Sequence, residues 1–199
     1  KSVYSADEAF YLLTLPDSDT TYCFDMRSPL QDGSQRATTW SGLTLLALTI
    51  TEAGAIYIGL SSGIVEYKGY LDGTEKYQMR YFSNPMDFGN GSNLKFLKKF
   101  NITIIGGQNT DATLNWGYDY STGFTKQVFT LTGSVNSGQY GLSEYNTTAE
   151  YTATASINTP KVNTSGSGEV VTIGIETEIN NTSFSIQKID IHALLGRLI

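Results

Sequence analysis

Short runs of β-branched, aromatic and aliphatic residues recur along the first 82 residues, and a turn signal closes most of them. The turn signals include Pro16-Asp17, Ser28-Pro29, Asp32-Gly33 and, at the end of this stretch, Asn84-Pro85. Strands in globular proteins are about 5 or 6 residues long and are bounded by Gly, Pro, Asn and Asp, so this spacing predicts β-strands. The expected strands cover residues 9–15, 21–26, 37–40, 43–50, 55–60, 64–67 and 77–82.

A longer alternating segment follows at residues 94–104. Counting by two places one set of apolar side chains on a single face: Leu94, Phe96, Phe100, Ile102 and Ile104. Lys98 falls on that same face and interrupts it. The pattern therefore predicts a strand with either a β-bulge or an exposed strand end near Lys98.

The remaining segments also favour strands. Residues 112–120 alternate, as do residues 169–176 and the terminal stretch 183–199, whereas residues 133–168 are rich in Gly, Ser, Thr and Asn and predict long loops or an irregular hairpin. The last two strands, separated from the loops by Gly166-Ser167-Gly168, are expected to pair as a closing antiparallel hairpin. The side chains expected to share faces are Leu114, Trp116, Tyr118 and Tyr120, then Val171, Ile173 and Ile175, then Ile189 and Ile191. No segment carries a helical apolar period, so the expected fold class is all-β.

Residues 84–93 are dense in Gly, Asn and Pro, which predicts a linker or a long loop. We therefore expect two domains, 1–92 and 93–199. The blade-like strand spacing of 1–92 suggests closing blades of a β-propeller, whose faces would pack on neighbouring blades through residues such as Leu43, Leu45, Ile56 and Ile58. Residues 93–199 are expected to form an antiparallel β-sandwich-like domain with its own core of Phe100, Ile102, Trp116, Ile173, Ile175 and Ile189.

The charge balance bears on partners. The net charge is −6, with 6 Lys/Arg against 11 Asp/Glu in residues 1–92 and 7 against 8 in residues 93–199. A protein that grips nucleic acid needs a basic surface to displace counterions, and this chain does not have that composition. Mild acidity suits a solvated surface in general, and it also suits one past which DNA must slide.

The cysteine count and the hydropathy of the chain limit the classes of protein to which it can belong. Cys23 is the single cysteine, so no disulfide within the chain is possible, and a small buried apolar role is expected for it. No apolar run approaches about 18 residues, so no membrane span is expected, and no signal peptide is evident. The chain begins Lys1-Ser-Val-Tyr and enters strand-like sequence at once, which suggests the C-terminal part of a longer polypeptide.

Three groups of polar residues are candidates for a catalytic or metal-binding site. Glu176 and Glu178 lie two residues apart and point from one face of a strand, whereas glycosidases place two carboxyl groups about 5–9 Å apart across a sugar, usually on different strands. Asp17 and Asp19 resemble the start of a calcium loop but lack its glycine and distal Glu, which favours a simple turn. His192 is the only histidine and is expected on the solvent face of its strand. We therefore predict no catalytic, metal-binding or cofactor-binding residues and no cofactor.

The aromatic residues leave two interpretations open. Tyr and Trp suit half-buried sheet faces and subunit interfaces, and they also line sugar-binding surfaces. The residues concerned are Trp40, Tyr67, Tyr70, Trp116, Tyr118 and Tyr120.

Three stretches of the chain carry a resemblance to one family. They are Phe10-Tyr-Leu-Leu-Thr-Leu-Pro through Tyr22-Cys-Phe-Asp-Met to Thr38-Thr-Trp40; Leu94-Lys-Phe-Leu-Lys-Lys-Phe with Asn115-Trp-Gly-Tyr-Asp-Tyr120; and the Gly-Ser-Gly strand with Leu194-Leu-Gly-Arg-Leu-Ile199. Together they resemble the C-terminal portion of the tail nozzle (tail tubular or hub-like) proteins of short-tailed bacteriophages.

The resemblance implies a structural virion protein, assembled in the host cytoplasm into a six-membered ring with the tail adaptor and other tail proteins. Such a ring retains DNA and passes it during ejection without binding it specifically, and the family supplies no catalytic residues. The residues that would line the channel are not assigned. The alternative is a receptor- or glycan-binding β-module of a tail fibre or of a bacterial surface protein.

Overall fold

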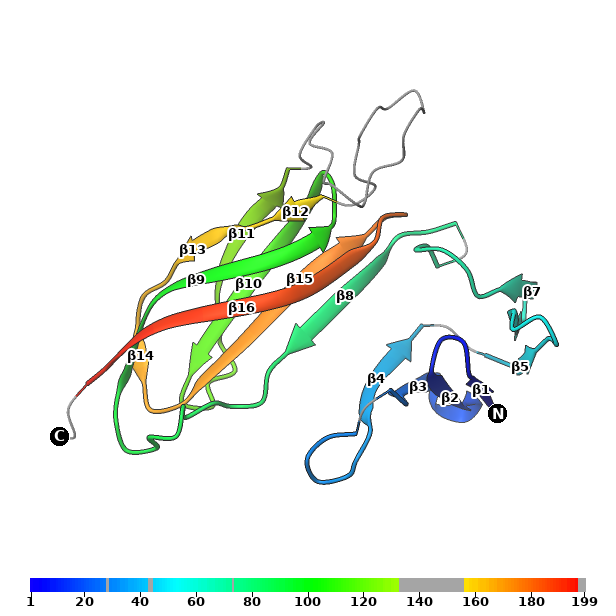
Figure 1. Ribbon diagram of the computed structural model, residues 1–199, viewed down its shortest axis with the longest axis horizontal. Coiled ribbons are helices and arrows are strands. Elements are labelled where there is room, and N and C mark those ends of the chain that lie inside the picture. Colours follow the sequence, from blue (N-terminus) through cyan, green and yellow to red (C-terminus); the bar gives the residue numbers. More distant parts are fainter. Residues whose placement is uncertain (28, 43–44, 73, 133–155, 197–199) are drawn as a thin grey trace. The chain divides into compact units, whose positions relative to one another are not determined.

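The strands predicted from the alternating pattern dominate the structure. The computed structural model describes residues 1–27, 29–42, 45–72, 74–132 and 156–196 (Figure 1). Within these ranges the chain is all-β, with antiparallel sheets and one short 3-10 helix, η1 (Pro16–Ser18). The expected all-β class is confirmed, and none of the sheets in the described part closes on itself.

The chain divides into two compact units, Lys1–Gly69 and Tyr70–Ile199. This division lies earlier than the boundary expected at residue 92. The reason is strand β8 (Tyr77–Phe82), which pairs along its whole length with strand β15 (Val171–Ile179). Residues 84–93 are therefore a loop inside the second unit, because strands of that unit lie on both sides of them.

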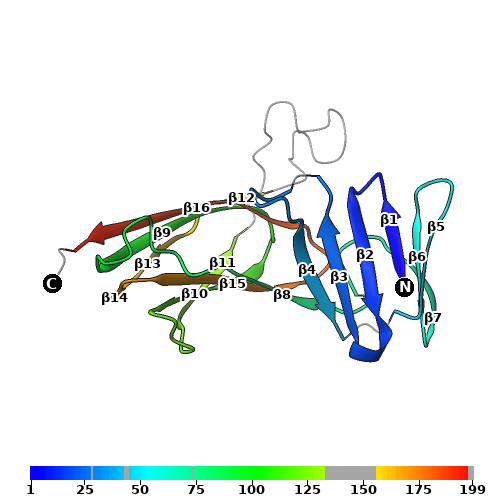
Figure 2. The same ribbon diagram turned by 90° about the horizontal axis from the view of Figure 1, so that it is seen from below.

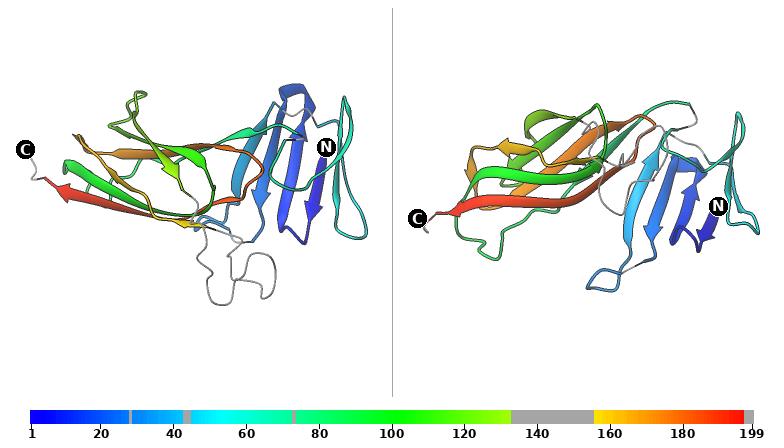
Figure 3. Two further views of the ribbon diagram at one scale, coloured as in Figure 1. Left: turned by 90° about the horizontal axis from the view of Figure 1, so that it is seen from above. Right: turned by 45° about the horizontal axis from the view of Figure 1, so that its top comes forward.

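The first unit contains two sheets, seen most clearly in Figure 3. One has the order β1-β2-β3-β4 and the other β5-β6-β7. Their bounds are β1 (Ser2–Ser5), β2 (Phe10–Leu15), β3 (Thr20–Asp25), β4 (Arg36–Ser41), β5 (Ala47–Ile50), β6 (Ile56–Leu60) and β7 (Gly63–Glu66).

The core of the first unit is small. Val3, Phe10, Leu12 and Ile56 form it, with Cys23, Trp40 and Leu48 partly buried against them. Of the four residues expected to face neighbouring blades, Leu45, Ile56 and Ile58 are buried within this chain, so that expectation is wrong for them. Leu43 lies outside the described residues.

The second unit contains two sheets that Figure 2 shows as two layers. One layer has the order β11-β10-β15-β8, with β10 spanning Thr110–Tyr118 and β11 spanning Thr125–Leu131. The other is built on the long strand β9 (Lys95–Gly106). One edge of β9 pairs with three short strands and the other with β16 (Phe184–Leu195); the short strands are β12 (Ile157–Asn158), β13 (Lys161–Asn163) and β14 (Ser167–Gly168).

Both layers contribute to one hydrophobic core. Its buried members are Leu97, Phe100, Ile102 and Ile104 of β9, Ala112, Leu114 and Trp116 of β10, Val171, Ile173 and Ile175 of β15, and also Leu131 and Val162. The expected core of residues 93–199 is confirmed, with Ile189 and Ile191 of β16 partly buried against it.

The bulge predicted near Lys98 is confirmed. His192 pairs with Lys99 and Ala193 with Leu97, which leaves Lys98 as an extra residue in β9. The extra residue inverts which side chains face inward. Leu97 is buried and Phe96 is 38% exposed, so the expected inward position of Phe96 is wrong.

The expected closing hairpin is also wrong. β15 pairs with β10 and β8, whereas β16 pairs with β9 in the other sheet. The link between them carries the chain from one layer to the other, and Asn181 takes a left-handed conformation there (φ 50°). The two strands therefore meet across the core, where their apolar faces pack, and not side by side.

Two aromatic side chains hold the Gly-Ser-Gly turn in place. The Trp116 indole donates to the Ser165 carbonyl at 3.1 Å, and the Tyr118 hydroxyl donates to the same oxygen at 2.9 Å. Gly166 has φ +99°, and a Cβ there would lie 2.6 Å from the Tyr118 ring. Tyr120 does not join this face, because it lies beyond the end of β10 and is 75% exposed.

A buried lysine anchors the loop before β9. Lys95 is fully buried, and its ammonium donates to the carbonyl oxygens of Asn90 and Glu169, the latter at 2.6 Å. A buried ammonium requires such acceptors, since an unpartnered charge is costly in an apolar interior. One side chain thus ties the 84–93 loop to the start of β15.

We expect Lys95→Met to destabilise the protein by about 1–3 kcal/mol, because two carbonyls lose a charged donor while the apolar stem remains. Lys98→Met at the exposed bulge is the matched control and should change stability by less than about 0.5 kcal/mol. Urea unfolding followed by fluorescence would measure both. Equal midpoints for the two variants would show that the ammonium has no anchoring role.

Candidate functional site

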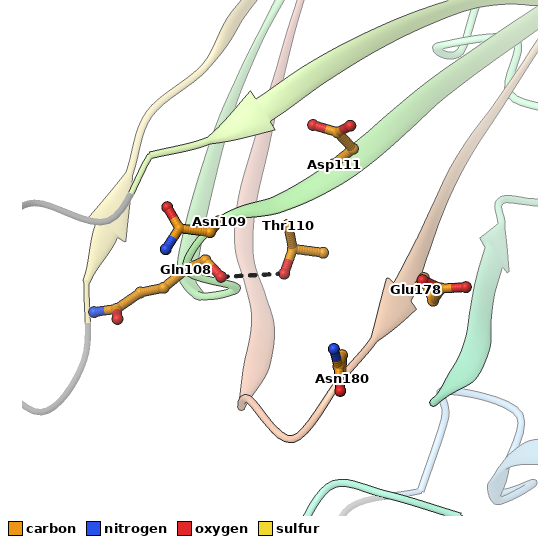
Figure 4. Close-up of a pocket in the computed structure, with 6 residues that line it drawn as sticks. All are labelled: Gln108, Asn109, Thr110, Asp111, Glu178 and Asn180. Carbon is orange, nitrogen blue, oxygen red and sulfur yellow. Dashed lines mark hydrogen bonds between the residues drawn. The ribbon is translucent and has the colours of Figure 1, made fainter. Parts of the chain in front are cut away.

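A polar depression lies at one end of the second unit (Figure 4). Its volume is about 390 Å³. Three carboxamides, two carboxylates and one hydroxyl line it, from Gln108, Asn109, Thr110, Asp111, Glu178 and Asn180. No apolar side chain contributes to this lining set.

The β9–β10 turn positions half of this lining. Gly106 and Gly107 have φ +85° and +68°, and Asn109 has φ 54°, a conformation that Asn adopts more readily than most residues. The Thr110 hydroxyl donates to the Gln108 carbonyl at 3.3 Å, as drawn in Figure 4. The turn therefore directs the amides of Gln108 and Asn109 into the depression, and the Thr110–Gln108 hydrogen bond holds its backbone.

Both carboxylates of the depression already accept a hydrogen bond. The Thr130 hydroxyl donates to Asp111 at 2.6 Å, and Lys76 pairs with Glu178 at 2.7 Å. The Lys76–Glu178 pair is about half exposed on both sides, so water screens it. What remains is a set of amide donors and acceptors suited to hydroxyl groups.

Sequence reasoning did not identify this depression. The Gly106-Gly107 turn was visible, but only the pairing of β10 with β15 brings Asn180 and Glu178 to the same end as Gln108. That pairing joins residues that lie 53 to 65 positions apart in the sequence, so no local pattern predicts it.

A second feature lies on the outer face of the β11-β10-β15-β8 sheet. The Phe82 and Phe124 rings lie 5.2 Å apart between centroids. A Cβ on Gly174 would be 2.3 Å from Phe82, and one on Gly117 would be 3.1 Å from Phe124. Asn115, directly opposite Gly174, is fully buried, and neither polar atom of its amide has a hydrogen-bond partner among the described residues.

The paired glutamates lie as the sequence predicted. Glu176 and Glu178 share the outer face of β15, with Glu176 partly buried opposite Arg80 and Glu178 exposed. Only Glu178 lines the depression, so the two carboxylates do not converge on one space. The opposed arrangement that acid–base hydrolysis of a sugar requires is not formed by this pair.

The other two candidates occupy turn and strand surface. Asp17 lies in η1 and Asp19 follows it with φ 48°, as a turn requires. His192 is exposed on β16, and its Nε2 lies 2.8 Å from the Asn101 amide nitrogen. Within the described ranges, no group of three or more His, Cys, Asp or Glu side chains is placed to hold a metal ion.

The aromatic candidates separate into buried and exposed sets. Trp116 is a core residue, and Trp40 stacks on Tyr67 with centroids 5.7 Å apart. Phe10 meets the same tyrosine edge-on. Tyr67, Tyr70 and Tyr120 are the exposed members, at 43%, 48% and 75%, so the six residues are not one exposed set.

Cys23 is half-buried on β3 and belongs to the margin of the first unit's core. Burial raises the pKa of its thiol, and a hydrogen bond with Thr38 partly offsets this. This matches the apolar role expected from the sequence.

Comparison with known proteins adds no family. No protein-family model matches the chain, and no curated protein is similar enough to count as a relative. No helix in the described part of the chain is long and apolar enough to cross a membrane.

We expect the Cys23 thiol to react with iodoacetamide along a pH profile whose midpoint lies above the pKa of about 8.5 of a free cysteine. The sign follows from burial, which disfavours the charged thiolate in the folded state. Stopped alkylation followed by mass spectrometry would give the profile, with the urea-unfolded chain as control. A folded-state midpoint at or below that of the unfolded chain would contradict the burial argument.

Proposed function

We propose that this chain is a structural virion protein, part of the nozzle of a short-tailed phage that retains DNA and then lets it pass. The three resembling stretches support this proposal, as does the all-β architecture. The first unit would supply closing blades of a propeller, and the second a sandwich-like domain. Assembly into a ring with other tail proteins, inside the host cell, belongs to the same proposal.

The observation that carries the proposal is the acidic balance of the chain. Its net charge is −6, with 13 Lys and Arg against 19 Asp and Glu. Four of the cations are also engaged: Arg27, Lys76 and Lys188 each pair with a carboxylate, at 2.9, 2.7 and 3.0 Å, and Lys95 is buried. A surface with this balance is poorly suited to neutralising phosphates, so a conduit built from it would not hold DNA in place.

The local electrostatics illustrate this. Arg27 donates two hydrogen bonds to Asp25, which hold the pKa of that carboxyl at about 2. The pair therefore remains ionised at pH values well above 2, so Arg27 keeps its partner at neutral pH. A basic side chain occupied in this way is a poor competitor for a phosphate group.

The test is the position of the chain in a particle. We expect mass spectrometry to detect peptides of this chain in purified virions of the phage whose genome encodes it. We also expect electron microscopy with an antibody against residues 70–199 to place label on the tail axis. An antibody against the major capsid protein controls for accessibility. Label on the fibres, or virions without the chain, would overturn the nozzle proposal.

A glycan- or receptor-binding module is the second candidate, favoured by the amide-lined depression of Figure 4. Carboxamides and carboxylates hydrogen-bond sugar hydroxyls from both donor and acceptor sides.

If this second function holds, the chain should bind members of a glycan array, and Asn109→Ala with Asn180→Ala should weaken binding at least about tenfold, since each lost polar contact costs roughly 1 kcal/mol. Glu176→Gln, on the same sheet face but outside the depression, is the control. An array with no bound glycan, or binding unaffected by the double substitution, would remove this candidate.

A further inference from the structure

Strand β16 lies at an edge of its sheet. β9 is the one strand that pairs with it among the described residues, so its opposite edge has no strand partner there (Figures 1 and 2). Edge strands of this length are templates for pairing unless they are interrupted. The register shift at Ile186/Lys188 leaves Gln187 as an extra residue that interrupts β16, whereas the shift at His192/Ala193 places its extra residue, Lys98, in β9, so β16 is regular from Lys188 onward.

The backbone direction at this edge follows from β9. The Ile102 amide donates to the Pro160 carbonyl on the β12–β13 side of β9, so its polar groups point away from β16. Because these groups alternate along a strand, those of Asn101 and Thr103 point toward β16. Their partners Asp190 and Lys188 use their own backbone groups in that pairing, and Ile189 therefore directs its N–H and C=O outward.

The apolar side chains of the same strand are incompletely covered. Ile102 and Ile104 of β9 are no more than 1% exposed, whereas Ile186, Ile189 and Ile191 of β16 are only partly buried against the same core. The core is thus closed at β9 and remains open at the β16 edge. A strand added there would cover these isoleucines and pair the outward backbone groups together.

We propose that the β16 edge binds the β16 edge of a second copy, as an antiparallel pair whose two-fold axis passes through Ile189. Lys188 of each copy then lies opposite Asp190 of the other. Opposite charges facing each other across an antiparallel pair are favourable, and like charges are not. The Lys188–Asp190 ion pair, at 3.0 Å within one strand, becomes a cluster of four alternating charges.

The neighbouring register is disfavoured by the same rule. An axis through Asp190 would place Asp190 of one copy directly opposite Asp190 of the other. The two carboxylates would then form a non-hydrogen-bonded pair, in which Cα atoms are only about 4.5 Å apart. With the axis through Ile189, the extra residue Gln187 of each copy lies opposite Ile191 of the other, so this bulge limits the regular pairing at both ends by symmetry. Because the contact uses the same patch on both copies, it closes at a dimer and does not propagate, so it is distinct from a head-to-tail ring contact. The proposal does not depend on the phage assignment.

The test uses the full chain with Cys23→Ser as background. Ile189→Cys should form a disulfide-linked dimer under mild oxidation, because paired residues of this kind have Cα atoms about 5.5 Å apart, within disulfide range. Gln127→Cys, exposed on the β11 edge of the other sheet, is the matched control and should give little dimer.

Charge substitutions without added cysteine provide the second arm. Lys188→Asp should weaken the dimer about tenfold by analytical ultracentrifugation, and Lys188→Asp with Asp190→Lys should restore it, because the swap again sets opposite charges face to face. Restoration together with selective crosslinking would support the proposal. A monomer at all concentrations, or dimers insensitive to the single substitution, would overturn it.

Discussion

Strand β9 is the element on which the second unit depends. It pairs along one edge with three short strands and along the other with β16, and its inward side chains form the middle of the shared core. Leu97 lies before the extra residue Lys98, and Phe100, Ile102 and Ile104 lie after it. The bulge lets both stretches of the strand direct their apolar side chains into the core. Without that bulge either Leu97 or the Phe100–Ile104 series would point to solvent, because a shift of one residue turns every side chain to the other face.

Much of this architecture is legible in the sequence. A short strand-like run identified β8, alternation identified β9, β10 and β15, and a charged residue on an apolar face indicated the irregularity at Lys98. The failures share one cause. Alternation shows which side chains share a face of a strand, but it does not show which strands are neighbours. For that reason β15 and β16 were expected to pair, and β8 was assigned to the first domain although it pairs with β15 in the second unit. Pairings over long sequence separations, such as β8 with β15, leave no trace in local pattern.

The candidate site shows the same limit. Its six lining side chains are ordinary surface residues of a turn and two strand ends, and nothing in their types distinguishes them from solvated Asn, Gln and Asp elsewhere. Of the residues that did attract attention, Glu178 lines the site, whereas Glu176 and His192 lie elsewhere on strand surfaces. The two proposed functions rest on the acidic balance of the chain and on a depression lined by carboxamides and carboxylates. For that reason the proposed functions are mechanical or adhesive.

On the outer face of the β11-β10-β15-β8 sheet, the side-chain volumes at positions 82 and 174 depend on each other. Phe82 occupies the volume that any side chain at position 174 would need, since a Cβ there would lie 2.3 Å from its ring. A Cβ on Gly117 would be 3.1 Å from Phe124, a tight contact that needs only a small shift of that ring. Substitution at positions 174 and 82 is therefore coupled: a larger residue at 174 requires the Phe82 ring to move or to be replaced by a smaller side chain.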